Sequence, residues 1–437
     1  MTRRTTLAAL MTFSIFGLAM LLSGSCGGGG APKNAGDHTQ TRSVIILAID
    51  GLRADSLGCY GGSSETPALD ALARESVLFD QAWSQAPAMQ SSLTSLLTGL
   101  YPTTNGLVEP GDRLVPEATT LAESLSAAGL QTAAFIQGPE GGDAFGMDQG
   151  FGQYAIGPKP GQGALAWLDE HREDDVFVMI AGWSAGHLED TTDTLPAPEG
   201  FALRLQEALA SENSHPLGNE DLAYARAAYA DHVTRIDTAV GQLIENLRSS
   251  GRLETATLIV VGTSGFALSE HGDLINNSLY PAVTRVPLMI RKPGGDPAVI
   301  NTVVEVLDLM PTVLEMTGIP SSEGIQGSSL MAIISGTSNP PYVAFSESDM
   351  AGGMTSVVMN GMQLVTTAEE TALFDLASDP MALTNVADQF PQKVTVLSEH
   401  RDAWSKMVAA VSLDPNRKTE DLDDDTLNQL RSLGYIQ

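Results

Sequence analysis

Four short runs of apolar and β-branched residues dominate the hydrophobic pattern of the chain. They cover residues 43–49, 131–137, 175–183 and 256–261. Continuous apolar runs of this length predict strands that are buried on both faces, as in a parallel sheet covered by helices. A helical stripe spans 223–251, where apolar residues recur every three or four positions and Gly251 ends the pattern. The pattern therefore predicts an α/β fold.

The C-terminal third has a different pattern. Short strand candidates lie at hairpin spacing at 342–345, 356–359 and 362–366. We therefore expect an α/β domain at 42–335 and a smaller C-terminal α+β subdomain at 336–437.

The N-terminus reads as a targeting segment. Arg3 and Arg4 precede an apolar run at 7–22, which is too short for a confident membrane span, and small residues then lead to Cys26. A glycine-rich stretch follows. This pattern resembles a bacterial lipoprotein signal at 1–25 with a flexible tether at 26–41, so we expect an exported envelope protein lipidated at Cys26. A plain secretory signal is the alternative.

The charge balance narrows the range of partners. The 437 residues include 23 basic and 53 acidic side chains, which gives a formal net charge of −30. Nucleic-acid binding requires basic surface, so a nucleic-acid partner is not expected. The membrane is expected to be reached only through a lipid at Cys26. If Cys26 is lipidated, Cys59 is the one remaining cysteine and no intramolecular disulfide can form.

Residues 87–101 predict a helix that begins near a candidate site. Ser91 and Ser92 suit its first turn, Leu93 begins an apolar face, and Gly99 ends it. A helix start offers unpaired N–H groups and the positive end of the helix dipole. It is therefore a natural seat for a tetrahedral anion.

Several stretches of this text resemble the sulfatase family of the alkaline-phosphatase superfamily. They are 49–61 (IDGLRADSLGCYG), 96–99 (LLTG), 101–106 (YPTTNG) and 373–380 (LFDLASDP). The resemblance covers about residues 43–437, and within it residues 303–318 match a helix of the family, so a helix is expected there. It implies a central, mostly parallel sheet flanked by helices, and it implies hydrolysis of sulfuric esters by a formylglycine nucleophile beside a divalent cation.

The positions that carry the family's chemistry differ in this chain. Met89 stands at the nucleophile position and Leu93 at an arginine position. A thioether has no proton to lose and cannot become an aldehyde hydrate. Asp50 keeps the first metal-ligand position, but Gly51 follows it with no side chain. The Asp-His pair that would hold the metal is missing between Ser264 and Gly265.

Other polar site positions are replaced or kept only in part. Asn105 stands where the family has a histidine, and Asn276 or Asn277 stands where it has an anion-binding lysine. The remnants that the resemblance leaves are His187, Ser91 and Ser92 as catalytic candidates and Asn105 and His271 as anion-binding candidates.

These departures favour a non-catalytic sulfatase-like protein that binds or scaffolds. One carboxylate, Asp50, does not hold a hard cation that prefers six or more oxygen ligands. No cofactor is therefore expected, and calcium would be the cation if the site were intact. An anionic or glycan ligand could still bind at the helix start and His187. The alternative is an active sulfate- or phosphate-ester hydrolase that uses unorthodox residues.

Overall fold

The computed structural model describes residues 42–108, 112–138, 145–186, 188, 195–210, 217–272, 278–337, 342–349 and 353–414. The predicted signal, the tether and Cys26 lie outside these residues. No helix in the described ranges is both long and apolar enough to cross a membrane.

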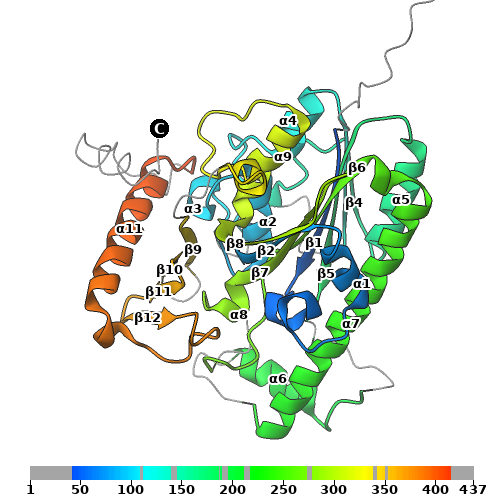
Figure 1. The fold of residues 1–437 in the computed structure, drawn as a ribbon. Coiled ribbons are helices and arrows are strands. Elements are labelled where there is room, and N and C mark those ends of the chain that lie inside the picture. Colours follow the sequence, from blue (N-terminus) through cyan, green and yellow to red (C-terminus); the bar gives the residue numbers. More distant parts are fainter. Residues whose placement is uncertain are drawn as a thin grey trace, which may run out of the picture. The chain divides into compact units, whose positions relative to one another are not determined.

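A sheet of eight strands forms the centre of the fold (Figure 1). Its strands, in spatial order, are β4 (Gln153–Ile156), β3 (Gln131–Ile136), β5 (Val176–Ser184), β1 (Ser43–Asp50), β6 (Ala256–Gly262), β7 (Arg285–Arg291), β2 (Val77–Trp83) and β8 (Ala298–Glu305). All neighbouring pairs are parallel except those that involve β7, which runs antiparallel to β6 and β2. The apolar run of β1 is buried along its whole length except at Asp50, which explains why it lies in the middle.

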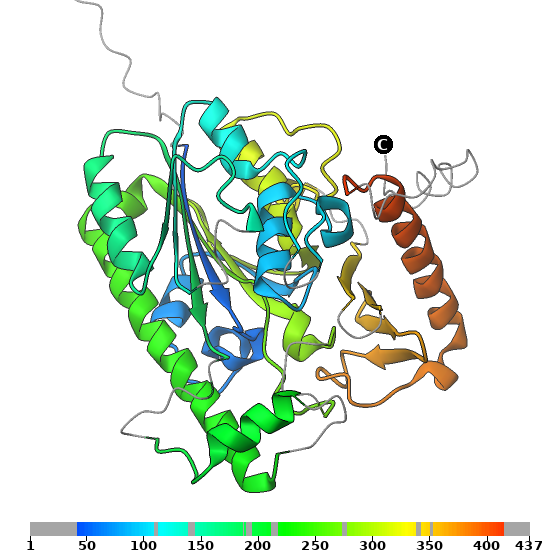
Figure 2. The same cartoon turned by 180° about the vertical axis from the view of Figure 1, so that it is seen from behind.

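Helices cover both faces of this sheet and form a separate core on each face (Figures 1 and 2). On one face lie α1 (Pro67–Ala73), α5 (Pro160–Glu170), α6 (Phe201–Ala210) and the long helix α7 (Asn219–Ser249). On the other lie α2 (Met89–Thr98), α4 (Leu121–Ala127), α9 (Leu309–Thr317) and the short α10 (Met331–Ile334). Short helices α3 (Pro102–Asn105) and α8 (Pro281–Thr284) lie in connections.

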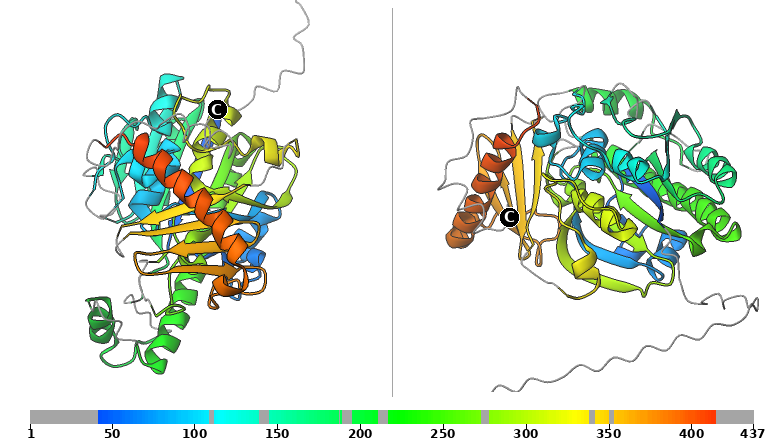
Figure 3. Two further views of the ribbon diagram at one scale, coloured as in Figure 1. Left: turned by 90° about the vertical axis from the view of Figure 1, so that its left-hand side faces the viewer. Right: turned by 90° about the horizontal axis from the view of Figure 1, so that it is seen from above.

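A second sheet of four antiparallel strands follows (Figure 3). Its spatial order is β12 (Thr371–Asp375), β11 (Met362–Thr366), β10 (Met354–Met359) and β9 (Ala344–Ser348). One face packs on α11 (Pro391–Ala410), where Trp404 stacks on Phe345 with ring centroids 5.1 Å apart.

The structure confirms the predicted fold class and the four long apolar runs, which become β1, β3, β5 and β6. The helix expected from residue 303 is wrong at its start, because β8 continues to Glu305 and α9 begins only at Leu309. Pairing with β2 decides this boundary, and such pairing is invisible to a local apolar pattern.

A buried pair of carboxyl groups joins the two sheets. Glu305, at the end of β8, accepts hydrogen bonds from the Tyr101 hydroxyl at 2.9 Å and from the Phe345 N–H of β9 at 2.9 Å. Asp308 accepts from the N–H groups of Glu305 at 2.9 Å and Ser328 at 2.7 Å. Burial raises the pKa of Glu305 well above its usual range and raises that of Asp308 to about 7.

This pair predicts a pH dependence of stability. A carboxyl whose pKa is raised by folding binds its proton more tightly in the folded state, so its contribution to stability is present below pH about 4 and is lost as pH rises toward 7. In Asp308→Asn one such group is removed. We expect a shallower fall of the free energy of unfolding between pH 4 and 7, measured by urea titration. The exposed Asp388→Asn should leave the slope unchanged, and equal slopes in both variants would contradict the assignment.

Candidate functional site

The carboxyl ends of three adjacent strands converge on one acidic side chain. Asp50 ends β1, Ser184 ends the neighbouring β5, and Thr263 follows β6 on the other side. Ligands of open α/β sheets bind at this edge, so it is the first place to look for chemistry.

Three hydroxyl groups donate hydrogen bonds to the Asp50 carboxylate. Thr263 Oγ1 lies 3.1 Å and Ser264 Oγ 3.0 Å from Oδ1, and Ser184 Oγ lies 3.3 Å from Oδ2. Burial raises the pKa of Asp50, while these hydrogen bonds oppose that shift. Both oxygens of the carboxylate are therefore already engaged by neutral donors of the chain itself.

The residues around Asp50 do not fit a hard divalent cation. Calcium takes six to eight oxygen ligands, with carboxylates prominent among them. Here the neighbours of Asp50 are hydroxyls that donate to it, and the next residue, Gly51, has φ +64°. A Cβ at Gly51 would lie 3.1 Å from the N atom of Gly186. Within the described ranges, no cluster of three or more His, Cys, Asp or Glu side chains could hold a metal ion.

The loop after β6, where the ligand pair is missing from the sequence, packs tightly against its neighbours. The N–H of Gly265 donates to the Val283 carbonyl at 2.6 Å, so the loop lies directly against α8. A Cβ at Gly265 would meet the Ala282 carbonyl oxygen at 2.1 Å, far inside van der Waals contact. This position accepts only glycine, so no side chain at residue 265 can reach Asp50.

The predicted anion seat is filled by the chain's own packing. Met89 begins α2 and is 7% exposed, while Leu93 is fully buried in the core beneath the helix. Ser91 donates to the Val108 carbonyl at 3.1 Å, and Ser92 Oγ lies 2.9 Å from Ser84 Oγ. Neither hydroxyl is more than 1% exposed, so both lie in the packed interior.

Ser84 connects the helix start to the Asp50 site. Its hydroxyl lies 2.6 Å from the Thr263 carbonyl oxygen, and the side chain of Thr263 donates to Asp50. The two predicted parts of the site, the helix start and the tip of β1, are thus brought together through hydroxyl groups.

The remaining predicted residues lie in different settings. Asn105 is fully buried, and its Oδ1 accepts from the Leu107 N–H at 3.0 Å. The imidazole of His271 stacks on Tyr280 with ring centroids 3.5 Å apart, and its Nε2 lies 3.1 Å from the Met381 carbonyl oxygen. His187, Asn276 and Asn277 lie outside the described residues.

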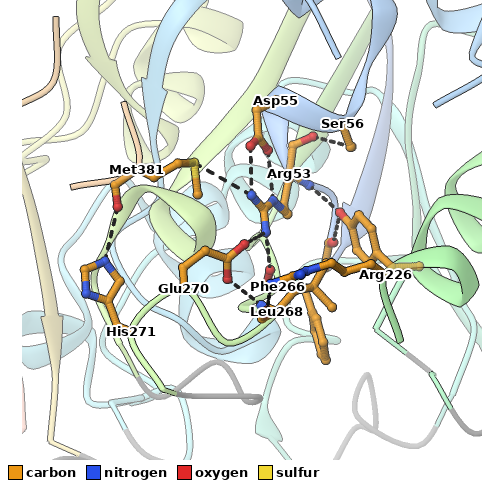
Figure 4. A network of polar contacts seen from close by, with 11 residues as sticks. Arg53, Asp55, Ser56, Arg226, Phe266, Leu268, Glu270, His271 and Met381 are labelled. Carbon is orange, nitrogen blue, oxygen red and sulfur yellow. Dashed lines mark hydrogen bonds and ion pairs between the residues drawn. The ribbon is translucent and has the colours of Figure 1, made fainter. Parts of the chain in front are cut away.

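Sequence reasoning missed Arg53, which fixes the loop after β6 beside the site (Figure 4). Its guanidinium forms a bidentate ion pair with Asp55, with both distances 2.8 Å, and a second ion pair with Glu270 in the loop after β6. The other oxygen of Glu270 accepts from the Leu268 N–H at 2.6 Å. The arginine three residues after a strand end and the acid in a distant loop were the only available signals.

Further contacts fix the same corner. The Tyr229 hydroxyl of α7 donates to the Gly51 carbonyl at 2.8 Å and accepts from the Arg53 N–H at 3.0 Å. Arg226, one turn earlier, donates to the Leu268 carbonyl at 3.3 Å (Figure 4). The loop after β6 is therefore tied both to β1 and to α7.

Removal of Arg53 should cost much more stability than removal of a surface arginine. Arg53→Ala leaves Glu270, whose side chain is only 15% exposed, without its countercharge. We expect the free energy of unfolding to fall by about 3 kcal/mol. The control, Arg172→Ala, breaks a pair whose side chains are 67% and 62% exposed and should cost less than about 1 kcal/mol. Urea unfolding measures both, and equal losses would refute the role of Arg53.

Comparisons with known proteins agree on one family. The sulfatase family model matches residues 42–319, and the model described as N-sulphoglucosamine sulphohydrolase, C-terminal, matches residues 269–407. Among curated proteins, arylsulfatase K of Xenopus laevis is 33% identical over 196 residues, which cover 41% of this chain and 37% of that protein. The matched region thus spans little more than a third of that relative.

Two further similarities extend over most of the chain. The ulvan-active sulfatase of Formosa agariphila is 24% identical over 434 residues, with 85% of this chain and 82% of that protein covered. In fold, the phosphonate monoester hydrolase of Agrobacterium radiobacter superposes with a TM-score of 0.70 at 18% identity, over 84% of this chain and 96% of the other. With the strand-end acid, the helix start and the two-sheet architecture, these matches lead to one conclusion: the chain belongs to the sulfatase family of the alkaline-phosphatase superfamily, whose reaction is the hydrolysis of sulfuric esters.

Proposed function

We propose that this chain is a non-catalytic member of the sulfatase family that serves as a binding or scaffold protein of the bacterial cell envelope. One observation carries the proposal. The Asp50 carboxylate, which the family resemblance places at the first metal-ligand position, accepts hydrogen bonds from the hydroxyls of Thr263, Ser264 and Ser184. Among the described residues, no group of three or more His, Cys, Asp or Glu side chains is placed to hold a metal ion.

The chemistry of sulfate-ester cleavage supports the same conclusion. The reaction needs an activated nucleophile, a cation that neutralises the ester oxygens and an acid for the leaving group. Met89 supplies no nucleophile, and the Asp50 surroundings supply no cation. Loss of a single electrostatic contact typically costs about a hundredfold in rate, so the combined losses leave negligible turnover.

The alternative, an active hydrolase with a replacement serine, receives no support from the geometry. Ser91 and Ser92 are 1% and 0% exposed, and each already has a hydrogen-bond partner. A nucleophilic hydroxyl has to reach the substrate and lie beside a base. Among the described residues, the polar atoms that contact these two hydroxyls are a carbonyl oxygen and another serine hydroxyl.

A pocket beside the Asp50 site supports a binding role. A cavity of about 200 Å³ lies between the end of β5 and α7, lined by Gln137, Trp183, Ser184, His232, Arg235, Ile236 and Ala239. Ser184 also contacts Asp50, so the pocket adjoins the strand edge. Arg235 Nε forms an ion pair with Asp231 at 3.1 Å, and its side chain is 48% exposed, so the other N–H groups of the guanidinium suit an anionic group there. An anion or an acidic glycan is therefore the ligand class that we propose.

The cellular place is part of the proposal. The segment before residue 42 has the pattern of a lipoprotein signal with Cys26 as the lipidated residue, so we propose an exported, lipid-anchored protein. Labelling with a fatty-acid analogue, lost in Cys26→Ala, tests this arrangement.

Metal and activity measurements test the loss of catalysis together. Elemental analysis of the purified protein should find calcium far below one equivalent. Added calcium should not raise the melting temperature of the protein. A specific cation at a hundred times its Kd would add about 2.7 kcal/mol of stability. Turnover of aryl sulfate and aryl phosphate should stay at background in the natural chain and in Met89→Ser. One equivalent of calcium, with turnover that Ser91→Ala or Ser92→Ala abolishes, would establish the hydrolase instead.

The anion pocket has its own test. Calorimetry with sulfate and phosphate should give saturable heat. In Arg235→Ala the Kd for the anion should rise at least tenfold, because a charged hydrogen-bond donor is lost. Arg248→Ala is the matched control, because Arg248 lies on the same helix and is also in an ion pair, with Glu75, but does not line the pocket; this variant should bind as the natural chain does. Absence of heat with both anions would remove the anion as ligand.

A further inference from the structure

A second, larger cavity lies away from the Asp50 site, between the edge of the central sheet and the C-terminal sheet. Its volume is about 970 Å³, at the upper end of the range of about 300–1,000 Å³ that is typical of ligand pockets. One wall is the edge strand β8, and the facing wall comes from β10, the turn after it and the segment after β12. None of its residues belongs to the site described above, so the proposed function does not use it.

Among the described residues, those that line the walls carry no charged side chain. They are formed by Gln81, Ile300, Asn301, Thr302, Val303, Ile333, Gly336, Tyr342, Val358, Asn360, Gly361, Leu376 and Ala377. This is unusual surface for a chain with 53 acidic residues and a net charge of −30. An anion would meet the repulsive field of the protein without a local cation, and a cation would find no carboxylate in the wall. The cavity therefore suits an uncharged ligand.

Two asparagines line the cavity, one on each wall. Asn301 lies on β8 and Asn360 in the turn between β10 and β11, and both residues are exposed. Within the described part of the chain, neither side-chain amide forms a hydrogen bond to the protein. An amide presents a donor and an acceptor side by side, which matches a pair of adjacent hydroxyl groups.

The geometry of the turn explains the choice of asparagine at 360 but not the presence of its amide in the cavity. Asn360 and Gly361 have φ values of +51° and +74°, which a tight two-residue hairpin requires. Glycine would satisfy the same turn. Asn360 can therefore be replaced by glycine without loss of the turn, which makes the side chain separately testable.

Apolar groups complete the surface between the amides. Ile333 and Val358 are buried, and Ile300, Val303, Leu376 and the ring of Tyr342 are partly buried. A wall that combines apolar and aromatic surface with a few polar groups binds molecules that have both apolar faces and hydroxyl edges. Sugar rings have both, because their C–H faces are apolar and their edges are lined with hydroxyls.

We propose that this cavity is a binding site for a neutral oligosaccharide, contacted by Asn301 on one wall and Asn360 on the other. The site is independent of the Asp50 region and of the anion pocket. Through this cavity the protein would bind an uncharged stretch of a glycan, whether or not the ligand near the Asp50 site is anionic.

Calorimetry on the full chain tests the proposal. The probes are maltotetraose, cellotetraose, laminaritetraose and chitotetraose, four neutral oligosaccharides that differ in linkage or sugar. At least one should bind with saturable heat. In the double variant Asn301→Ala/Asn360→Gly the Kd of that probe should rise at least tenfold, because hydrogen bonds to two amides are lost.

Matched controls separate the cavity from general effects. Asn246→Ala removes an amide on α7 that donates to the Gln242 carbonyl and lies outside the cavity, so it should leave the Kd unchanged. Thermal unfolding checks that each variant is folded. If the double variant is unfolded, Ala377→Trp, which places an indole at the cavity wall, takes its place and should weaken binding by the same factor.

Three results would overturn the inference. The first is absence of heat with all four probes. The second is binding that persists in the folded cavity variants. The third is an extended peptide that binds the edge of β8 and is displaced by none of the sugars. None of these depends on calcium content or on ester turnover, so failure here is distinguishable from failure of the proposed function.

Discussion

The partial burial of one carboxylate, with hydroxyls as its hydrogen-bond partners among the described residues, is the constraint that organises this site. Asp50 ends the central strand β1, where family chemistry would place a cation. A buried carboxylate has to be paired with a positive charge, hydrogen-bonded or protonated. Here three hydroxyl groups of the chain hydrogen-bond the Asp50 carboxylate. Burial also raises its pKa, which favours protonation. The surroundings of Asp50 are thus complete as they stand.

The loop after β6 lies close to α8 and to the segment after β1 because of two residues, Arg53 and Gly265. Arg53 forms an ion pair with Glu270. Gly265 lets the backbone contact α8, where any larger residue would collide with the Ala282 carbonyl. The shortened loop and the hydroxyl cage therefore form one structural unit.

The scaffold does not depend on the chemistry. The two cores on the faces of the central sheet, and the third core under α11, are formed by apolar packing that does not involve Asp50. Because burial of apolar surface supplies most of the stability of such a domain, site residues can change while the fold persists. Binding functions can then occupy the cavities that the fold leaves at its edges, each with a ligand class set by the charge of its walls.

The sequence by itself determined the strand runs, the long helix, the family and the unsuitable residues at positions 51, 89 and 93, because these follow from local patterns and motif spacing. Only the tertiary structure decided which side chains contact Asp50. Thr263, Ser264 and Ser184 come from strand ends far apart in the sequence, and nothing in their spacing shows that they meet at Asp50. The ion pair of Arg53 with Glu270 and the burial of Ser91 and Ser92 were equally hidden. Burial and long-range contacts arise from the packing of the whole sheet, which no local window of the sequence contains.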